Sequence, residues 1–307
     1  MKLAFLGTSA FACPALQAVD EAFGVDFVIT QPDRPVGRHA KLAPSAIKRL
    51  AVERGLSLSQ PENINDPDSV ARLTERALDA IVVASYGQLL KPAVFEAARW
   101  GAINIHASLL PAYRGAAPVQ WAIIRGETRT GVSTFFIEKG LDTGDVLMEA
   151  ATEIAPEETA LELEERLAQL GAVLIVDTLR ALEEGTARAV PQPSEGLSLA
   201  PSLTRADGRI DWNQPAECIH NLVRGTIPWP GAWAQLDGKR VKIHRTRPTS
   251  LESGVLAPGM IGPVETRRLL VGTGGRLLEV LELQREGKGR TSGTAFLNGL
   301  SPQARFT

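Results

Sequence analysis

Three side chains whose chemistry suits acyl transfer to an amine lie on one strand-like run and in one later turn. Asn104 and His106 close the apolar run that starts at Ala102, and Asp142 lies in the turn Gly140–Asp145, which reads GLDTGD. Because side chains of a strand alternate between its faces, Asn104 and His106 point the same way. If a loop brings the Asp142 carboxylate beside them, an amide, an imidazole and an acid meet. Such a set can stabilise a negative oxygen and remove a proton from an amine.

His106 and Asp142 could each have a purely structural role instead of a catalytic one. A lone histidine at the end of a strand is usually a satisfied structural residue, and Leu-Asp-Thr-Gly is good turn-forming sequence. The position of Asn104 two residues before His106, with Ser-Leu-Leu-Pro following, favours catalysis for the histidine. For Asp142 the residues alone leave both explanations open.

The composition indicates a soluble globular protein with more than one core. The chain has 307 residues, of which 44% are hydrophobic and 22% charged, and this length suits two domains. No run approaches the roughly 18 apolar residues of a membrane-spanning helix, and MKLAFLGTSAF indicates a first buried strand better than a signal peptide. We therefore expect a cytoplasmic protein. The two cysteines and four histidines show no metal-binding spacing, so we predict no metal.

The first half of the chain alternates apolar runs with stretches typical of helices. This alternation predicts an α/β fold with a parallel sheet covered on both faces, whose ligands bind at the carboxyl ends of the strands. Gly131–Ile137 and Asp145–Ala150 flank the GLDTG turn as a hairpin-like pair. The expected strands are Leu3–Leu6, Val25–Thr30, Ala80–Ser85 and Ala102–Ile105, and the expected helices are Pro14–Phe23, Pro44–Arg54, Pro67–Ala77, Pro92–Ala98 and Pro156–Glu184.

The last third of the chain has a different pattern. Residues 190–205 are rich in Pro, Ser and Gly and have the composition of a linker, which divides the chain into a domain at 1–189 and a second at 206–307. Short strand-like runs with Gly-containing turns predict a small β-barrel or sandwich in the second domain. Residues 1–205 contain 19 Lys and Arg against 26 Asp and Glu, whereas residues 206–307 contain 14 against 9. A basic second domain suggests a polyanionic partner.

The motif Asn-x-His-x-Ser-Leu-Leu-Pro, with the later Leu-Asp-x-Gly, resembles the folate-dependent formyltransferases. Thr30–Arg38 (TQPDRPVGR) and Gly131–Leu147 resemble the branch of that family that formylates methionyl-tRNA. The resemblance implies a Rossmann-like catalytic domain and a C-terminal open β-barrel related to the oligonucleotide-binding fold. It also implies transfer of the formyl group of 10-formyltetrahydrofolate to the α-amine of initiator methionyl-tRNA. We expect no metal, no membrane partner and a monomer.

The resemblance assigns roles to particular residues. Asn104, His106 and Asp142 are expected to be catalytic. Arg114 and Gly115 follow the catalytic strand, and the sequence does not decide whether they shape the loop or meet substrate. Residues expected to bind the folate are Tyr86, Gly87, Leu89, Ser108, Leu109, Leu110 and Pro111; those expected to contact tRNA are Arg38 and Lys41 in a basic loop and Lys239, Arg240, Lys242 and Arg245 in the basic domain.

Several alternatives stay open at this stage. The basic loop could be an ordinary solvated loop, and His39-Ala40 makes it less basic than the family pattern. The catalytic residues would not distinguish a sibling formyltransferase acting on an amino sugar nucleotide or glycinamide ribonucleotide. A formyltetrahydrofolate hydrolase would use related chemistry on water. The Thr30–Arg38 loop and the basic second domain favour tRNA. The catalytic set argues against a non-catalytic RNA-binding protein, and the absence of a glycine fingerprint argues against an oxidoreductase.

Overall fold

The computed structural model describes residues 1–307 except 37–40, 255, 263–266, 299 and 301–303. The described chain forms two compact units that alternate along the sequence. The division into a first domain at 1–189, a linker at 190–205 and a second domain at 206–307 remains a prediction, because compact units do not show which parts of the chain fold independently. The first unit comprises Met1–Gly115, Arg129–Glu153 and Glu164–Ala200, and the second comprises Ala116–Thr128, Ile154–Leu163 and Pro201–Thr307.

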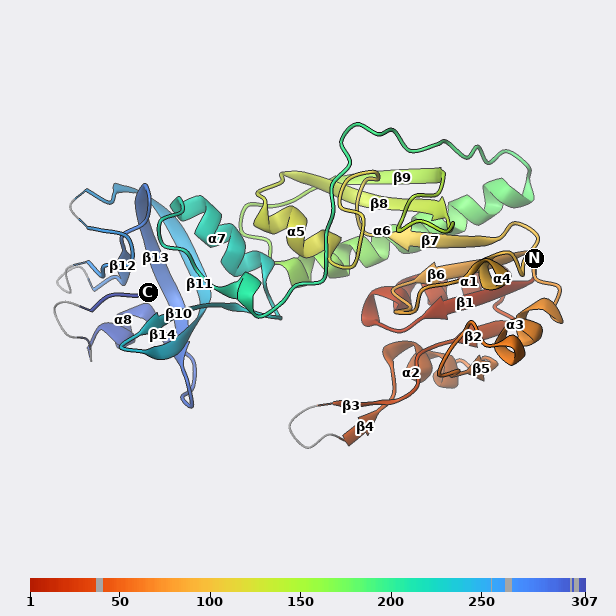
Figure 1. The fold of residues 1–307 in the computed structure, drawn as a ribbon, viewed down its shortest axis with the longest axis horizontal. Helices are drawn as coiled ribbons and strands as arrows, with labels where there is room; N and C mark the ends of the chain where they lie inside the picture. Colours follow the sequence, from red (N-terminus) through yellow and green to blue (C-terminus); the bar gives the residue numbers. More distant parts are fainter. Residues whose placement is uncertain (37–40, 255, 263–266, 299, 301–303) are drawn as a thin grey trace. The chain divides into compact units, whose positions relative to one another are not determined.

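The first unit is built on a mixed sheet with the strand order β5-β2-β1-β6-β7-β8-β9 (Figure 1). The five neighbouring strands β5, β2, β1, β6 and β7 are parallel. Strand β8 runs antiparallel to β7, and β9 runs antiparallel to β8. This confirms the predicted α/β fold and the hairpin pair. The strands are β1 Leu3–Gly7, β2 Phe27–Ile29, β5 Leu58–Ser59, β6 Ala80–Ala84, β7 Ala102–His106, β8 Arg129–Phe136 and β9 Val146–Glu153.

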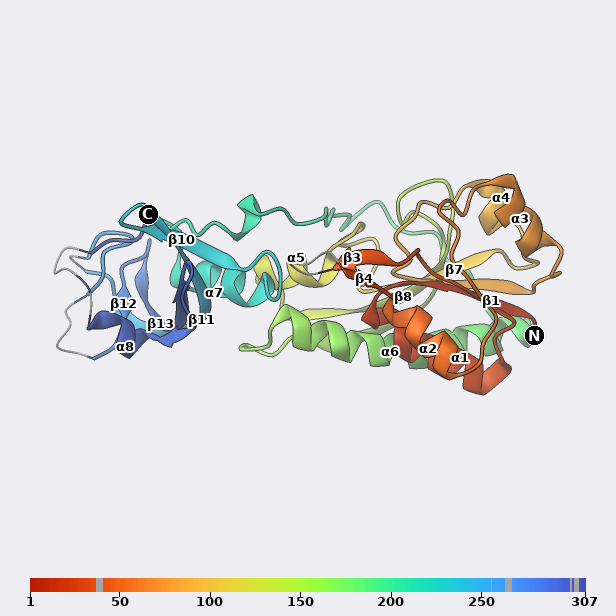
Figure 2. The ribbon, with the colours of Figure 1, turned by 90° about the horizontal axis from the view of Figure 1, so that it is seen from below.

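Helices cover both faces of this sheet, because its central strands are apolar on both sides. Every residue of β1 and of β6 is buried. In Figure 2, α1 (Cys13–Phe23), α2 (Ala46–Glu53) and α6 (Ala160–Glu183) lie on one face, and α3 (Pro67–Thr74) and α4 (Pro92–Phe95) lie on the other.

The strand order reverses between β1 and β6, which is where open α/β sheets bind ligands. From β1 the chain continues outward through β2 and β5, and it then returns to β6 and β7 on the other side of β1. A hydrogen bond from the Thr8 hydroxyl to the Tyr86 carbonyl oxygen, 2.7 Å long, joins the two carboxyl ends. The candidate folate and catalytic residues after β6 and β7 therefore lie at this edge of the sheet.

The second unit contains an antiparallel sheet with the order β10-β11-β13-β12, in which β14 pairs with β13. Isolated bridges Leu236–Phe306, Met260–Arg305 and Ile261–Val271 connect its two edge strands through short extended segments, an arrangement consistent with the predicted barrel. The elements are α5 Pro118–Ile124, α7 Ala216–Gly225, β10 Ala232–Leu236, β11 Lys239–Glu252, β12 Leu270–Val271, β13 Arg276–Arg285, β14 Thr291–Ser292 and α8 Gly293–Leu297.

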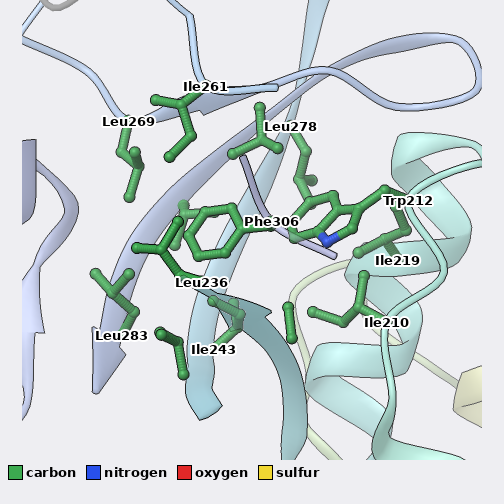
Figure 3. Close-up of a cluster of buried hydrophobic side chains, with 14 of the residues drawn as sticks. Ile210, Trp212, Ile219, Leu236, Ile243, Ile261, Leu269, Leu278, Leu283 and Phe306 are labelled. Atoms are coloured by element: carbon green, nitrogen blue, oxygen red, sulfur yellow. The ribbon is translucent and has the colours of Figure 1, made fainter. Parts of the chain in front are cut away.

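Residues near the end of the chain complete the core of the second unit. Phe306 is 1% exposed, and its ring stacks on Trp212 with 5.4 Å between centroids (Figure 3). Aliphatic side chains of β10, β11 and β13 surround this pair. Trp212 is therefore a core residue, as expected for most tryptophans, whereas Trp229 is 54% exposed.

The short edge strand β5 was not predicted, and the start of helix α6 and the conformation of the basic stretch after β2 also differ from the sequence-based expectation. Helix α6 begins at Ala160, four residues after the expected Pro156, because Thr159 and Glu162 form a reciprocal cap: the Thr159 amide donates to the Glu162 carboxylate and the Glu162 amide to the Thr159 hydroxyl. This is the capping-box pattern. The basic stretch after β2 forms a two-stranded hairpin, β3 (Arg34–Val36) with β4 (Lys41–Ala43), and Arg38 lies outside the described residues.

Candidate active site

The imidazole of His106 lies at the end of β7, buried beside the carboxylate of Asp142. Its Nε2 lies 2.9 Å from the Tyr113 carbonyl oxygen. A carbonyl can only accept, so Nε2 carries a hydrogen and donates it. The Nδ1 atom lies 3.7 Å from Asp142 Oδ2, which is too long for a direct hydrogen bond. Nδ1 is therefore the nitrogen that is left for chemistry, and it faces an acid.

The turn that carries Asp142 is held in a backbone conformation that its sequence permits. Asp142 has φ +51°, a left-handed geometry that Asp tolerates better than most residues. A Cβ at Gly144 would collide with the carbonyl oxygen of Phe136, so the turn requires glycine there. Asp142 Oδ2 accepts a 2.8 Å hydrogen bond from the Gly115 amide, which fixes the carboxylate facing His106.

Gly115 therefore shapes this site through its backbone. It has φ +123°, and a Cβ there would lie 2.7 Å from the carbonyl oxygen of Ala200. Only glycine combines that conformation with such a close approach. Of the two roles considered for Gly115, the structure therefore supports the one in loop geometry.

Asn104 lies on β7 two residues before His106, so strand alternation places both side chains on one face. Its backbone is paired with Val83 of β6 and Phe135 of β8. The residue is half-buried, and within the described ranges its side-chain amide has no hydrogen-bond partner. That amide is free to donate to a bound oxygen. The structure thus brings His106 and Asp142 together directly and places Asn104 on the same strand face as His106.

The loop Ser108–Pro111, expected to bind folate, is held by a buried serine of the neighbouring strand. Ser133 is fully buried and lies opposite His106 in the β7–β8 register. Its hydroxyl accepts from the Leu110 amide (3.1 Å), and its hydrogen faces two acceptors, the Ser108 carbonyl oxygen (2.8 Å) and Glu149 Oε1 (3.0 Å). The Ser108 hydroxyl donates to the Ala112 carbonyl oxygen at 2.6 Å. Ser108 and Ser133 therefore shape the loop, and Leu109 packs against Gly131.

Substitution Ser133→Ala is expected to loosen this loop and to weaken binding of the folate that the family resemblance implies. It leaves a buried amide and a buried carbonyl without their hydroxyl partner, at a cost of about 1–3 kcal/mol. We expect KM for 10-formyltetrahydrofolate to rise about tenfold with a smaller change in kcat. Thr134→Val removes the adjacent buried hydroxyl, which bonds Thr178 instead, and is expected to leave KM unchanged. An equal rise in both variants would contradict a role for Ser133 in the loop.

The segment after β6 offers backbone groups to a ligand and keeps its tyrosine in the core. The Tyr86 side chain is 2% exposed, and burial raises the pKa of its phenol far above the ordinary value. Gly87 has φ +91°, and its backbone amide and carbonyl have no partner among the described residues. Leu89 is 72% exposed. An unpaired peptide group beside an exposed leucine fits a flat ligand with an amide-like edge, such as a pterin.

Four of the six basic residues expected to contact tRNA lie on one strand, β11. Lys239, Arg240, Lys242 and Arg245 of β11 are exposed, and none has an ion pair within the described part of the chain. Arg240 lies over the ring of Trp233, 4.4 Å from its centroid. By contrast, Arg247 of the same strand is bound to Glu279 at 2.7 Å. Lys41 lies on β4.

Sequence reasoning missed the groups that position this site. Tyr113 acts through its backbone carbonyl, so its side-chain type gave no signal. Ser133 could have been found, because it is a hydroxyl in the run GVSTFF of the expected hairpin-like pair. Gln192 donates to the carbonyl oxygens of Asp142 (2.9 Å) and Gly144 (2.7 Å), and its linker-like surroundings concealed it.

The chain belongs to the formyltransferase family. The family model described as formyl transferase matches residues 1–179, and the model described as formyl transferase, C-terminal domain, matches residues 202–301. The chain is 49% identical over 300 residues to the methionyl-tRNA formyltransferase of Solibacter usitatus, covering 97% of this chain and 96% of that protein. It is 46% identical to the methionyl-tRNA formyltransferase of Acidobacterium capsulatum, covering 100% and 99%.

Solved structures support the same fold. The sugar 3N-formyltransferase WlaRD, crystallised with dTDP and 5-N-formyl-THF, matches with a TM-score of 0.68 at 17% identity, covering 94% of this chain and 99% of that chain. In the described part of this chain, no helix has both the length and the apolar character needed to cross a membrane. The same residues contain no cluster of His, Cys, Asp and Glu suited to a metal ion.

Proposed function

We propose that this protein transfers the formyl group of 10-formyltetrahydrofolate to the α-amino group of initiator methionyl-tRNA. The observation that supports the chemistry is the facing pair of His106 Nδ1 and Asp142 Oδ2, 3.7 Å apart, with Asn104 on the same strand face and its amide without a partner among the described residues. The acceptor is inferred from relatives named methionyl-tRNA formyltransferase that align over nearly the whole chain.

The folate fits the edge of the sheet at the ends of β6 and β7. Gly87 would hold it through a peptide group that has no partner in the described part of the chain, and Leu89 through an exposed apolar surface. The loop Ser108–Pro111 would lie along it. When bound, 10-formyltetrahydrofolate supplies an electrophilic formyl carbon on a nitrogen that can leave. Asn104 would donate its amide to the formyl oxygen as negative charge develops there, an interaction that typically contributes about 10²–10³ in rate.

The proton of the attacking amine would pass to His106 Nδ1. Because Nε2 already carries a hydrogen and donates it to Tyr113, a neutral imidazole has its lone pair on Nδ1. The Asp142 carboxylate would then stabilise the imidazolium that forms. As the new C–N bond forms and the bond from the formyl carbon to the folate nitrogen breaks, His106 would return the proton to that nitrogen.

The rival acceptors are an amino sugar nucleotide and glycinamide ribonucleotide. The test supplies 10-formyltetrahydrofolate with charged initiator tRNA, an amino sugar nucleotide or glycinamide ribonucleotide in parallel, and follows the formylated product. We expect product with methionyl-tRNA alone. Formylation of another acceptor in preference would overturn the proposed function, as would hydrolysis of the folate without transfer.

Binding of tRNA is expected to weaken steeply with salt, because exposed basic side chains of β11 would replace counterions on phosphates. With four such contacts, we expect the affinity to fall on the order of 10²-fold between 50 and 200 mM salt. Lys242→Gln should reduce the slope of log Kd against log salt by about one. Arg247→Gln is the matched control, since Arg247 is bound to Glu279. A slope that neither variant changes would contradict a role for β11.

The proposal includes a monomer that acts in the cytoplasm. The basic hairpin with Lys41, and Arg38 beyond the described residues, would add tRNA contacts to those of the second unit. Size-exclusion chromatography with light scattering tests the oligomeric state, and a mass near 32.9 kDa is expected.

A further inference from the structure

The segment 190–200, which we call the connecting strap, is hydrogen-bonded to both loops of the candidate active site. All of its residues belong to the first unit. At one end Val190 and Val146 exchange backbone hydrogen bonds of 2.8 and 2.9 Å. At the other, the Arg114 amide donates to the Ser198 carbonyl oxygen, and the Ala200 amide donates to the Arg114 carbonyl oxygen. A segment with the composition of a linker is therefore attached to the catalytic loops.

Gln192 spans the two loops with one side chain. Its amide nitrogen donates to the carbonyl oxygens of Asp142 and Gly144, at 2.9 and 2.7 Å. Its amide oxygen accepts from Arg114 Nε and Nη2, at 3.1 and 2.7 Å. Both ends of the amide are thus used, and only a glutamine-like group can donate to the turn and accept from the arginine.

Ser198 makes the corresponding contact on the histidine side. Its hydroxyl accepts from the Tyr113 amide at 2.9 Å, and the Tyr113 carbonyl accepts from His106 Nε2. Most of the strap is exposed, whereas Gln192 and Ser198 are half-buried. The strap therefore contacts both the turn that carries Asp142 and Tyr113, whose carbonyl oxygen orients His106.

We propose that Gln192 is a positioning residue for formyl transfer, which it supports by holding the Asp142 turn against the 113–115 loop, with Ser198 in a secondary role. Asp142 has a left-handed backbone, and the two hydrogen bonds from the Gln192 amide to the carbonyl oxygens of Asp142 and Gly144 hold its turn. A displacement of about 1 Å at such a site can cost on the order of 10²-fold in rate. The inference rests on the proposed function, because it concerns the same pair of side chains.

The test measures kcat, both KM values and Tm for full-length variants. Gln192→Leu removes all four hydrogen bonds and is expected to lower kcat about 10- to 100-fold, with KM for the folate and the tRNA within about threefold. Gln192→Glu still accepts from Arg114 but cannot donate to Asp142 or Gly144, so it should lose as much kcat as Gln192→Leu. Ser198→Ala should show a smaller loss. Glu195→Ala changes an exposed strap residue without a described partner and should behave as wild type.

The outcomes separate this inference from the proposed function. Wild-type kcat in Gln192→Leu would overturn the positioning role, and so would full activity in Gln192→Glu with loss in Gln192→Leu, because Arg114 would then be the group that matters. Loss of kcat only in proportion to a lowered Tm would also contradict it. A wild-type protein that formylates none of the acceptors would instead refute the proposed function.

Discussion

Replacement of His106 by alanine is expected to lower kcat by about 10³-fold or more while the protein still folds and binds both substrates. The substitution removes the nitrogen that would accept the amine proton and the partner of the Asp142 carboxylate. General base catalysis typically contributes about 10²–10⁴ in rate. Steady-state formylation of methionyl-tRNA, together with equilibrium binding of a folate analogue, measures the two effects separately.

His106→Gln sharpens this test. A glutamine amide can still donate to the Tyr113 carbonyl oxygen, as Nε2 does at 2.9 Å, but it has no lone pair that takes a proton at neutral pH. We therefore expect a loss in kcat close to that of His106→Ala, with Tm nearer to wild type. Near-normal turnover in His106→Gln would mean that the histidine only holds the loop.

Apolar runs in the sequence were sufficient to predict the central strands of the sheet and the position of His106, although not the short edge strand β5. The run at Leu3–Leu6 is apolar throughout and the run at Ala80–Ser85 is apolar up to Ala84, because strands in the middle of a parallel sheet are buried on both faces. The run at Ala102–Ile105 ends directly before His106, which places the histidine at the edge where such sheets bind ligands. Periodicity is a local property, and these predictions needed nothing else.

The residues that position the histidine and the acid could not be predicted in the same way. Gln192 contacts residues 48 to 78 positions earlier in the chain, and its neighbours are Pro, Ser, Glu and Gly, the composition of a linker. Such a segment can still be ordered when its backbone pairs with distant loops. A local pattern contains no information about those partners.

The roles of individual residues in the Ser108–Pro111 loop could also not be predicted from the sequence alone. Sequence resemblance predicts that Ser108 meets the folate, yet its hydroxyl donates to the Ala112 carbonyl oxygen and the residue is 1% exposed. Which imidazole nitrogen of His106 is available likewise depends on a backbone carbonyl. Side-chain chemistry can be read from the sequence, whereas the backbone groups that direct it cannot.

Asp142→Asn is expected to lower kcat by about 10²–10³-fold with little effect on folding. An asparagine oxygen can still accept from the Gly115 amide, as Asp142 Oδ2 does at 2.8 Å, so the turn keeps its contact. What is lost is the negative charge 3.7 Å from His106 Nδ1. At an effective dielectric constant of about 20, a charge pair near 4 Å is worth about 4 kcal/mol, which sets an upper limit on the effect.

Asp145→Asn is the matched control, because it makes the same change three residues later on a side chain without a partner among the described residues. The double variant His106→Ala with Asp142→Asn decides how the two residues act. If the carboxylate works by stabilising a charged imidazole, its removal has no further effect once the imidazole is absent, so the double variant should be no slower than His106→Ala. If Asp142 instead takes the proton through water, independently of His106, the two losses should multiply. A double variant whose kcat falls by the product of the two single losses would therefore reject the proton path through Nδ1 and assign the base to the carboxylate.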